Sequence, residues 1–169
     1  QPIKLLQKLI HTDCKKFVFS SSGGTIFGEP NVIPTSEKDY AGEPVSPYGV
    51  AKKKLNDFIK LMLQEKNMSY SILNLANVYG PRQDPHGEAG VMSIFTGRML
   101  NNEIPIVYGD GNQTRDYIFV TDVVSALIKS SEMDDNLFLN IGTSKETSVN
   151  ELVSIIRSIT SWEGEPDYK

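Results

Sequence analysis

The sequence predicts an α/β protein built around a parallel sheet. Short apolar runs at 16–22, 70–75 and 137–142 are bounded by glycine or polar residues, which is typical of buried strands. Between them, apolar residues recur at spacings of three and four, downstream of Pro47 and again over 122–131, as in helices with one buried face. A strand, a crossover that contains a helix and a second strand predict a parallel pair.

The composition indicates a globular chain with one ordinary core, because the 169 residues are 39% hydrophobic and 22% charged. The formal charge of -4 and the scattered arginines argue against a nucleic-acid partner, and no apolar run approaches membrane-spanning length. A single cysteine, Cys14, excludes an internal disulfide and suits a reducing compartment, so we expect a cytoplasmic protein. His11 and His86 lack a partner pattern, so neither is expected to be catalytic, and no metal site is expected.

The N-terminal part is predicted to contain a helix over 2–12, the strand 16–22 and a long loop over 28–47. The glycines at 23–24 end the strand abruptly and leave the serines at 20–22 at its C-terminal edge, where open α/β sheets bind ligands. The alternative is that these serines only end a strand and begin a turn. The loop has no periodic pattern, and its length suggests a functional role.

A longer helix is predicted to begin at Ser46, a good N-cap, with Pro47 at the first helical position. Tyr48 and Lys52 are four residues apart and are therefore neighbours on one side of its first turn. A lysine ammonium beside a phenol favours the phenolate, which would make Tyr48 a general acid/base at neutral pH. The alternative is a surface tyrosine beside a solvated run of lysines at 52–54.

The second half of the chain is predicted to alternate strands and helices. Residues 77–82 leave the strand 70–75 at the same sheet edge as the serines. The elements that follow are an exposed loop over 83–90, a helix over 91–101 and strands over 104–108 and 115–120. Ser148 and Glu151 form a capping box that begins another helix.

Helical spacing also predicts which side chains face the core. In the helix that begins at Pro47 they are Ala51, Leu55, Phe58, Ile59, Met62 and Leu63. In the helix over 122–131 they are Val123, Val124, Leu127 and Ile128. In the helix after the capping box they are Leu152, Val153, Ile155, Ile156 and Ile159. Lys53 and Lys54 are expected to be exposed.

Four short motifs occur in order along the chain. They are Phe-Ser-Ser-Ser (19–22) before a glycine turn, Tyr48-Gly-Val-Ala-Lys52, Asn77-Val-Tyr-Gly-Pro-Arg82 and Gly109-Asp-Gly-Asn-Gln-Thr-Arg-Asp116. Together they resemble the extended short-chain dehydrogenase/reductases, in the branch of NAD-dependent nucleotide-sugar epimerases and dehydratases that includes UDP-glucose 4-epimerase-like enzymes. The resemblance covers nearly the whole chain, and the four motifs together are far more specific than any one of them.

The resemblance implies the C-terminal part of a Rossmann-type doubly wound parallel sheet, with part of a smaller α/β substrate domain. It implies that residues 1–80 and 113–142 belong to the NAD-binding domain, and residues 81–112 and 143–169 to the nucleotide-sugar domain. The family's glycine-rich turn, which seats the NAD pyrophosphate on a helix N-terminus, has no counterpart in the sequence. We therefore expect a piece of a longer protein that alone binds NAD poorly and turns over nothing.

The resemblance implies three catalytic residues. Tyr48 would take the proton from the sugar 4-hydroxyl, Lys52 would bind the nicotinamide ribose and keep the tyrosine acidic, and Ser22 would hydrogen-bond the same hydroxyl. Counting back from the glycine at 28, however, places Gly23 at the catalytic position, so Ser21 and Thr25 remain alternatives. Ser22 is preferred because the strand fixes its register. The remaining residues expected near the NAD cofactor are Ser20, Ser21, Ala76 and Val78.

For the substrate, the resemblance implies that Asn77 and Arg115 contact the diphosphate, for which a guanidinium is well suited. The alternative for Arg115 is a surface arginine paired with Asp110 or Asp116. The candidates for the uridine pocket are Val91, Ile106 and Tyr108.

The implied reaction is 4-epimerisation of a UDP-hexose of the glucose/galactose type with NAD. Family members that act as dehydratases carry an Asp-Glu pair where this chain has Gly-Gly-Thr at 23–25, so dehydration fits less well. A dehydratase, decarboxylase or reductase of the same family, or a non-catalytic binding relative, remains the alternative. The full-length protein is expected to be a homodimer that pairs through the Tyr48 helix and the helix before it.

Overall fold

The computed structural model describes residues 2–64, 66–85 and 90–169, so His86 and part of the predicted loop over 83–90 lie outside the described residues. The contacts divide the chain into two compact units, which are described separately. The first unit comprises 1–76 with 121–141, and the second comprises 77–120 with 142–169. The assignment of these segments to a cofactor domain and a substrate domain stays a prediction.

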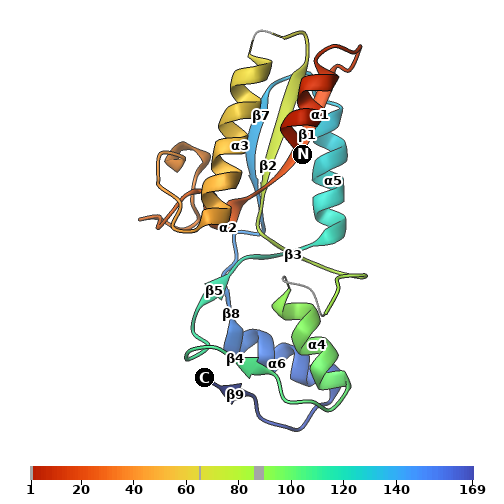
Figure 1. The fold of residues 1–169 in the computed structure, drawn as a ribbon. Coiled ribbons are helices and arrows are strands. Elements are labelled where there is room, and N and C mark those ends of the chain that lie inside the picture. Colours follow the sequence, from red (N-terminus) through yellow and green to blue (C-terminus); the bar gives the residue numbers. More distant parts are fainter. Residues whose placement is uncertain (1, 65, 86–89) are drawn as a thin grey trace. The chain divides into compact units, whose positions relative to one another are not determined.

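The first unit contains a parallel three-stranded sheet, which confirms the predicted fold class (Figure 1). Its strands are β1 (Lys16–Ser22), β2 (Ser69–Leu75) and β7 (Leu137–Ile141), in the order β1-β2-β7. The register aligns Phe19 with Ile72 and Phe138 in one row. The row of Ser21, Asn74 and Asn140 lies two residues further along. Residues of both rows project from the same face of the sheet, because side chains alternate along each strand.

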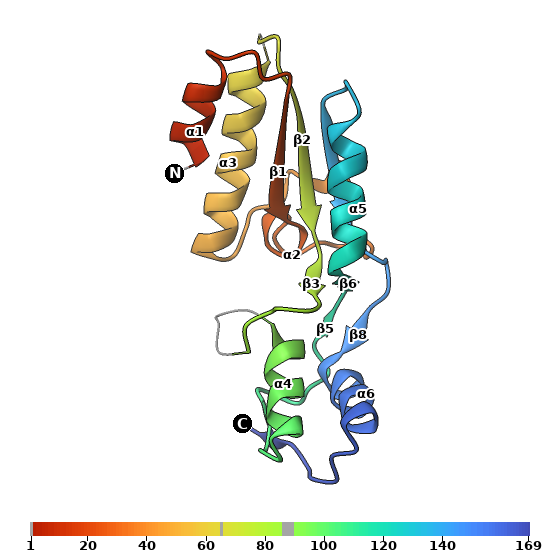
Figure 2. The same cartoon turned by 90° about the vertical axis from the view of Figure 1, so that its right-hand side faces the viewer.

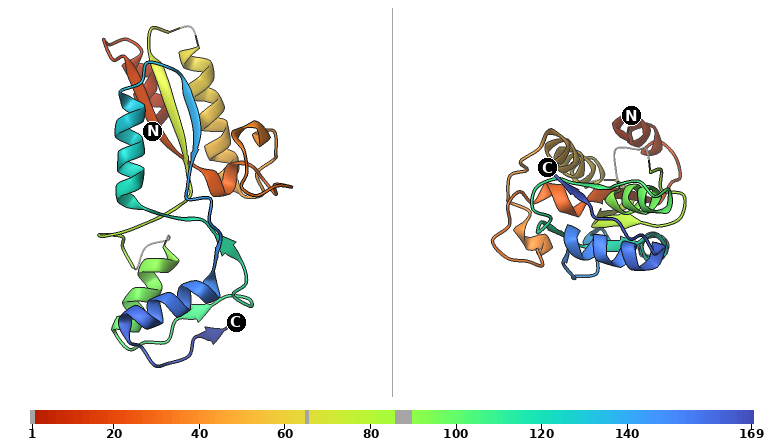
Figure 3. Two further views of the ribbon diagram at one scale, coloured as in Figure 1. Left: turned by 180° about the vertical axis from the view of Figure 1, so that it is seen from behind. Right: turned by 90° about the horizontal axis from the view of Figure 1, so that it is seen from below.

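Helices cover both faces of this sheet. Helices α1 (Pro2–Leu9) and α3 (Pro47–Leu63) lie on one face and α5 (Val120–Ser131) on the other (Figure 2). On the α3 face, apolar side chains form a core that consists of Leu6, Ile59, Leu63, Met68 and Ile72. The view from behind shows α5 against this other face of the sheet (Figure 3, left). There the Ser71 hydroxyl donates to the carbonyl oxygen of Ser130 at 3.1 Å. No helix among the described residues is long and apolar enough to cross a membrane.

The prediction that Lys53 is exposed is wrong. Lys53 is buried, and its ammonium donates to the carbonyl oxygen of Gly42 and lies 3.9 Å from Glu43 and 5.1 Å from the Tyr40 ring centroid. Segment 28–46 therefore supplies the partners that a buried ammonium needs. Ala51, predicted to face the core, is exposed instead, because α3 presents a partly polar stripe to the sheet.

The prediction of inward-facing residues on α5 is confirmed at Val123 and wrong at two positions. Val123 is buried, whereas Val124 and Ile128 are about half exposed. A single helix packed on a sheet buries only a narrow stripe, so residues on either flank of that stripe stay accessible.

The connection from β1 to α3 contains more structure than its glycines suggest. The turn predicted at 23–24 opens a short helix, α2 (Gly23–Ile26), and a 3-10 helix, η1 (Glu37–Asp39), interrupts the following loop. A Cβ at Gly23 would lie 3.1 Å from the carbonyl oxygen of Asn74, so glycine allows the chain to turn tightly over the end of β2.

In the described residues of the second unit there are three short strand pairs and two helices. Strands β3 (Asn77–Tyr79) and β6 (Tyr117–Phe119) are parallel, as are β4 (Ile106–Val107) and β9 (Asp167–Tyr168), whereas β5 (Thr114–Arg115) and β8 (Thr147–Ser148) are antiparallel. The single strand predicted over 115–120 is thus split at Asp116.

Helices α4 (Val91–Leu100) and α6 (Val149–Thr160) pack side by side in this unit (Figure 3, right). Their core consists of Phe95, Met99, Val107, Val149, Leu152, Val153, Ile156 and Trp162. The predicted capping box is confirmed: the Ser148 hydroxyl accepts from the amide of Glu151 at 3.1 Å, and the Glu151 carboxylate accepts from the amide of Ser148 at 2.7 Å. Ile155 and Ile159, which were predicted to face inward, are exposed because only one stripe of α6 faces the core.

Candidate active site

The start of α3 brings Tyr48 and Lys52 together beside the end of β1. The Ser46 hydroxyl caps the helix by accepting from the amide of Gly49 at 3.1 Å, and Pro47 is the first helical residue, as predicted. These two features fix Tyr48 in the first turn, where its side chain is 56% exposed.

Lys52 lies one turn further along α3, between the tyrosine and the sheet. Its Nζ donates to the carbonyl oxygen of Ser20 at 3.2 Å and lies 5.7 Å from the centroid of the Tyr48 ring. It also lies 5.1 Å from the ring centroid of Phe19. The ammonium is therefore held near the C-terminal edge of the sheet and beside the phenol ring.

A close backbone approach fixes the start of α3 against α2. A Cβ added to Gly49 would lie 2.3 Å from the carbonyl oxygen of Thr25. Only glycine allows this separation, so the residue after Tyr48 sets the distance between the tyrosine-bearing turn and the end of β1.

The structure separates the candidate hydroxyls by the sheet face on which each lies. Ser21 is in register with Asn74, which contacts α3 through Asn56, whereas Ser22 is in register with Leu75. By strand alternation Ser20 and Ser22 belong to the α5 face and Ser21 to the α3 face. Strand β1 extends to Ser22, as the preference for this residue assumed, and the choice among Ser22, Ser21 and Thr25 as the catalytic hydroxyl stays a prediction.

Two of these hydroxyl oxygens are buried without a partner. Among the residues that the structure describes, neither the Ser21 Oγ nor the Thr25 Oγ1 makes a hydrogen bond, although both atoms are buried. Buried hydroxyls are usually paired, so these two unpaired oxygens are candidates for contacts with a ligand.

The predicted contact residues after β2 fall on both sides of the division between units. Ala76 ends the first segment of unit one, where its amide donates to the carbonyl oxygen of Ile141 at 2.9 Å. Asn77 and Val78 begin unit two as part of β3, and Asn77 is exposed. The amide of Asn77 donates to the carbonyl oxygen of Asp116 at 2.9 Å.

Asp116 is a structural residue that the sequence did not predict. Its carboxylate accepts from the amide and the hydroxyl of Thr143, at 2.8 Å and 2.6 Å, and from the amide of Ser144 at 2.9 Å. These bonds fix the backbone of Asp116, which directly follows Arg115 and accepts the hydrogen bond from Asn77. Asp116 therefore helps to position both predicted diphosphate contacts. The signal that could have revealed it is the Arg-Asp pair that ends the 109–116 motif.

Arg115 is exposed on β5, and its Nη1 donates to the carbonyl oxygen of Thr114 at 2.7 Å. In the described part of the chain it forms no ion pair with Asp110 or Asp116, so the alternative that explained it as a surface ion pair is not seen. Burial raises the pKa of Tyr117, and the positive charge of Arg115 partly offsets that rise.

The three candidates for the uridine pocket differ in exposure. Tyr108 is 73% exposed after β4, and Ile106 is partly buried within it. Val91 is the first residue of α4 and packs against the core of unit two. The turn that follows Tyr108 is held by Gln113, whose side-chain amide donates to the Tyr108 carbonyl oxygen at 2.9 Å.

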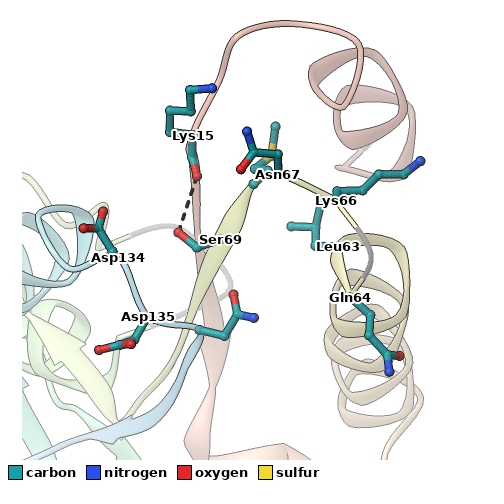
Figure 4. Close-up of a pocket in the computed structure, with 10 residues that line it drawn as sticks. Lys15, Leu63, Gln64, Lys66, Asn67, Ser69, Asp134 and Asp135 are labelled. Atoms are coloured by element: carbon teal, nitrogen blue, oxygen red, sulfur yellow. Dashed lines mark hydrogen bonds between the residues drawn. The ribbon is translucent and has the colours of Figure 1, made fainter.

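A hollow at the opposite end of the first sheet does not contribute to this site. It is lined by polar residues that include Lys15, Lys66, Asp134 and Asp135 (Figure 4). The side chains of Lys66 and Asp135 point away from each other, so these charges do not converge on one ligand position. Among the described residues, no group of His, Cys, Asp and Glu side chains is arranged to hold a metal ion.

Comparison with known proteins identifies the family. The model of the NAD dependent epimerase/dehydratase family matches residues 2–142. This chain belongs to that family. The recognition made from the four motifs is thereby confirmed, and the family's NAD dependence agrees with the predicted cofactor.

Individual relatives agree with this assignment. The chain is 47% identical over 166 residues to a putative UDP-glucose 4-epimerase of Methanocaldococcus jannaschii, a match that covers 98% of this chain and 54% of that protein. It is 46% identical to the UDP-glucose 4-epimerase of Thermotoga maritima solved with UDP-glucose, with a TM-score of 0.95 and coverage of 99% and 54%. The Thermus thermophilus UDP-glucose 4-epimerase in complex with NAD is 31% identical, with a TM-score of 0.88 and coverage of 99% and 54%. The chain thus spans about half the length of the relatives it matches.

Proposed function

We propose that this chain carries the proton-transfer residues of an NAD-dependent 4-epimerase that acts on a UDP-hexose of the glucose/galactose type. The observation that carries the proposal is the position of the Lys52 ammonium, between the Ser20 carbonyl oxygen and the Tyr48 ring at the carboxyl end of a parallel sheet. Membership of the epimerase/dehydratase family and similarity to UDP-glucose 4-epimerases support it.

In this proposal the Tyr48 phenolate takes the proton of the sugar 4-hydroxyl and later returns it. Lys52 stabilises the phenolate and hydrogen-bonds the cofactor ribose. A strand-end hydroxyl, from Ser22, Ser21 or Thr25, donates to the same sugar oxygen. NAD, when bound, supplies the hydride acceptor and donor for C4 of the sugar. The exposure of Tyr48 and the two unpaired hydroxyls, of Ser21 and Thr25, are consistent with a polar ligand at the carboxyl end of the sheet.

The second unit would hold the nucleotide. Asn77 and Arg115 would bind the diphosphate, since an exposed guanidinium can form paired hydrogen bonds to phosphate oxygens. Tyr108, Ile106 and Val91 would contact the uridine. Ser20, Ala76 and Val78 would lie against the cofactor.

We also propose that the full-length protein is a cytoplasmic homodimer that pairs through α1 and α3. Exposed apolar side chains on these helices support the pairing: Ile3, Leu5, Val50 and Leu61. Analytical ultracentrifugation of a chain extended to the length of its relatives tests this, and a monomer at micromolar concentration would contradict it.

The proposed reaction is tested by incubating such an extended chain with UDP-glucose. Formation of UDP-galactose without a released 4-keto sugar supports epimerisation. Accumulation of a 4-keto product would instead indicate a dehydratase or a related activity. Comparing Ser21→Ala, Ser22→Ala and Thr25→Val identifies the catalytic hydroxyl as the one whose loss lowers kcat most.

A further inference from the structure

A third polar residue continues the stripe of Tyr48 and Lys52 along α3. Asn56 lies four residues after Lys52, on the same side of the helix, and is fully buried against the sheet. Two residues nearer the amino ends of the strands, the row of Phe19, Ile72 and Phe138 on the same sheet face is apolar. This face of the sheet therefore changes from apolar to polar at the level of Asn56, one helical turn after the candidate catalytic lysine.

Asn56 is the first member of a chain of side-chain amides. Its Nδ2 donates to the Oδ1 of Asn74 at 3.5 Å, and the Nδ2 of Asn74 donates to the Oδ1 of Asn140 at 3.1 Å. The Nδ2 of Asn140 then donates to the carbonyl oxygen of Thr35 at 2.9 Å, while its backbone amide donates to Glu37 at 2.7 Å. The chain therefore crosses from α3 through β2 and β7 to segment 28–46.

All three amides donate in the same direction, which leaves an acceptor at the start of the chain. The Oδ1 of Asn56 is buried and has no partner among the described residues. The hydroxyls of Ser21 and Thr25 are also buried and unpaired, and Ser21 occupies the same row as Asn74 and Asn140. Aligned hydrogen bonds polarise one another, so the terminal oxygen is a stronger acceptor than an isolated amide.

A purely structural role explains this arrangement poorly. An unpaired buried amide oxygen costs free energy, and an apolar side chain at 56 would extend the core below it at no such cost. The unpaired oxygen of Asn56 lies on the helix stripe that also carries Tyr48 and Lys52. Groups that cost folding free energy are concentrated at functional sites, so the position of this oxygen favours a functional role.

We propose that Asn56, Asn74 and Asn140 are positioning residues that hold the start of α3 against the strand-end hydroxyls and couple it to segment 28–46. The Oδ1 of Asn56, which has no partner among the described residues, leaves an acceptor on the sheet face that also carries the Ser21 hydroxyl. This inference rests on the proposed function in its kinetic part only, because the coupling between segment 28–46 and α3 is a property of the fold.

The test uses a chain extended to the length of its relatives, with Asn56→Leu, Asn140→Leu and the double variant. We expect Asn56→Leu to lower kcat about 10- to 100-fold while KM for UDP-glucose changes less than about threefold. The fall in kcat of the double variant should be no larger than the larger fall of the two single variants, because the effects of residues in one hydrogen-bonded network are not additive. Leu63→Ala, buried at the far end of α3, is the matched control and should lower stability without changing kcat.

A second readout does not depend on activity. Amide hydrogen exchange at 47–52 should be about 10-fold faster in Asn140→Leu than in the parent, and unchanged in Leu63→Ala. If the parent protein does not epimerise UDP-glucose, the proposed function is wrong. The exchange rates at 47–52 still show whether segment 28–46 and α3 are coupled. Unchanged exchange at 47–52 in Asn140→Leu, additive kinetic losses, or a kcat for Asn56→Leu within about twofold of the parent would overturn the proposal.

Discussion

Gly49 lies so close to Thr25 that a Cβ on Gly49 would be 2.3 Å from the Thr25 carbonyl oxygen. An alanine at this position must push the first turn of α3 away from α2 and carry Tyr48 with it. We expect Gly49→Ala to lower the free energy of unfolding by about 2 kcal/mol, as overpacking does elsewhere. Denaturant unfolding monitored by circular dichroism measures this change.

The matched control is Gly24→Ala in the adjacent helix α2. A Cβ on Gly24 would meet no atom within 4 Å, so the substitution should be neutral or slightly stabilising. Equal losses for the two variants would show that the close approach of α2 and α3 does not determine the cost.

Tyr40 anchors segment 28–46 to α3 and β7. Its hydroxyl donates to the Asp57 carboxylate at 2.9 Å and to the Lys53 carbonyl oxygen at 3.0 Å, and its ring packs edge-on against Phe138 at 4.8 Å. Burial, and then the hydrogen bond to Asp57, raise the pKa of Tyr40. We expect Tyr40→Phe to lower the free energy of unfolding by about 1–2 kcal/mol and to speed proteolysis within 28–46.

Tyr168→Phe is the control for Tyr40→Phe, since its hydroxyl donates to Asn150 at 2.9 Å from an exposed position. Water can replace the hydrogen bond at this exposed position, so Tyr168→Phe should lower the free energy of unfolding less than Tyr40→Phe does. A loss for Tyr168→Phe as large as that for Tyr40→Phe would contradict the anchoring role.

The cap of α6 predicts a pH dependence. Hydrogen bonds from the backbone amide and then the hydroxyl of Ser148 hold the pKa of Glu151 below its usual range. A lowered folded-state pKa contributes stability that is present above the unfolded value of about 4.3 and is lost as the pH falls toward the folded value. Glu151→Gln should therefore lower Tm at pH 7, and the difference from the parent should shrink below about pH 4. A Tm difference that is the same in acid as at neutral pH would show that charge plays no part in the cap.

Asp116 should affect both the stability of the second unit and nucleotide binding. Its carboxylate accepts hydrogen bonds from Thr143 and Ser144, so Asp116→Ala is expected to cost about 2–3 kcal/mol of stability. In an extended chain it should also weaken UDP binding, because Asn77 is bonded to its backbone. Calorimetry with UDP separates this from Arg115→Ala, which should weaken binding without loss of stability. If Arg115→Ala lowered the stability and Asp116→Ala did not, the stabilising role assigned to Asp116 and the binding role assigned to Arg115 would both be wrong.

Local patterns predicted those parts of the fold that local physics determines. Ser46 and Pro47 mark the start of α3, Ser148 and Glu151 mark the start of α6, and the one-turn spacing of Tyr48 and Lys52 brings them together. Lys53 could not be predicted to be buried, because its partners come from a loop of irregular structure. Exposed apolar residues such as Ile159 were predicted inward because periodicity identifies a helix face without saying how much of it a neighbour covers.

The sheet face on which each strand-end serine lies could not be predicted from the sequence. Sequence order makes Ser20, Ser21 and Ser22 equivalent strand-end residues, and only the pairing with β2 shows which of them faces α3. The amide chain of Asn56, Asn74 and Asn140 joins three separate elements, and Asp116 reaches across to Thr143. Contacts between distant segments leave no periodic signal in one sequence.

The most direct test compares turnover of UDP-glucose by Tyr48→Phe and by the parent in a chain extended to the length of its relatives. We predict that the parent forms UDP-galactose. The variant should keep its Tm and bind UDP-glucose within about threefold, but lose about 10³-fold or more in kcat, because phenylalanine cannot accept the proton. Turnover by Tyr48→Phe at the rate of the parent would contradict the claim that Tyr48 transfers the proton.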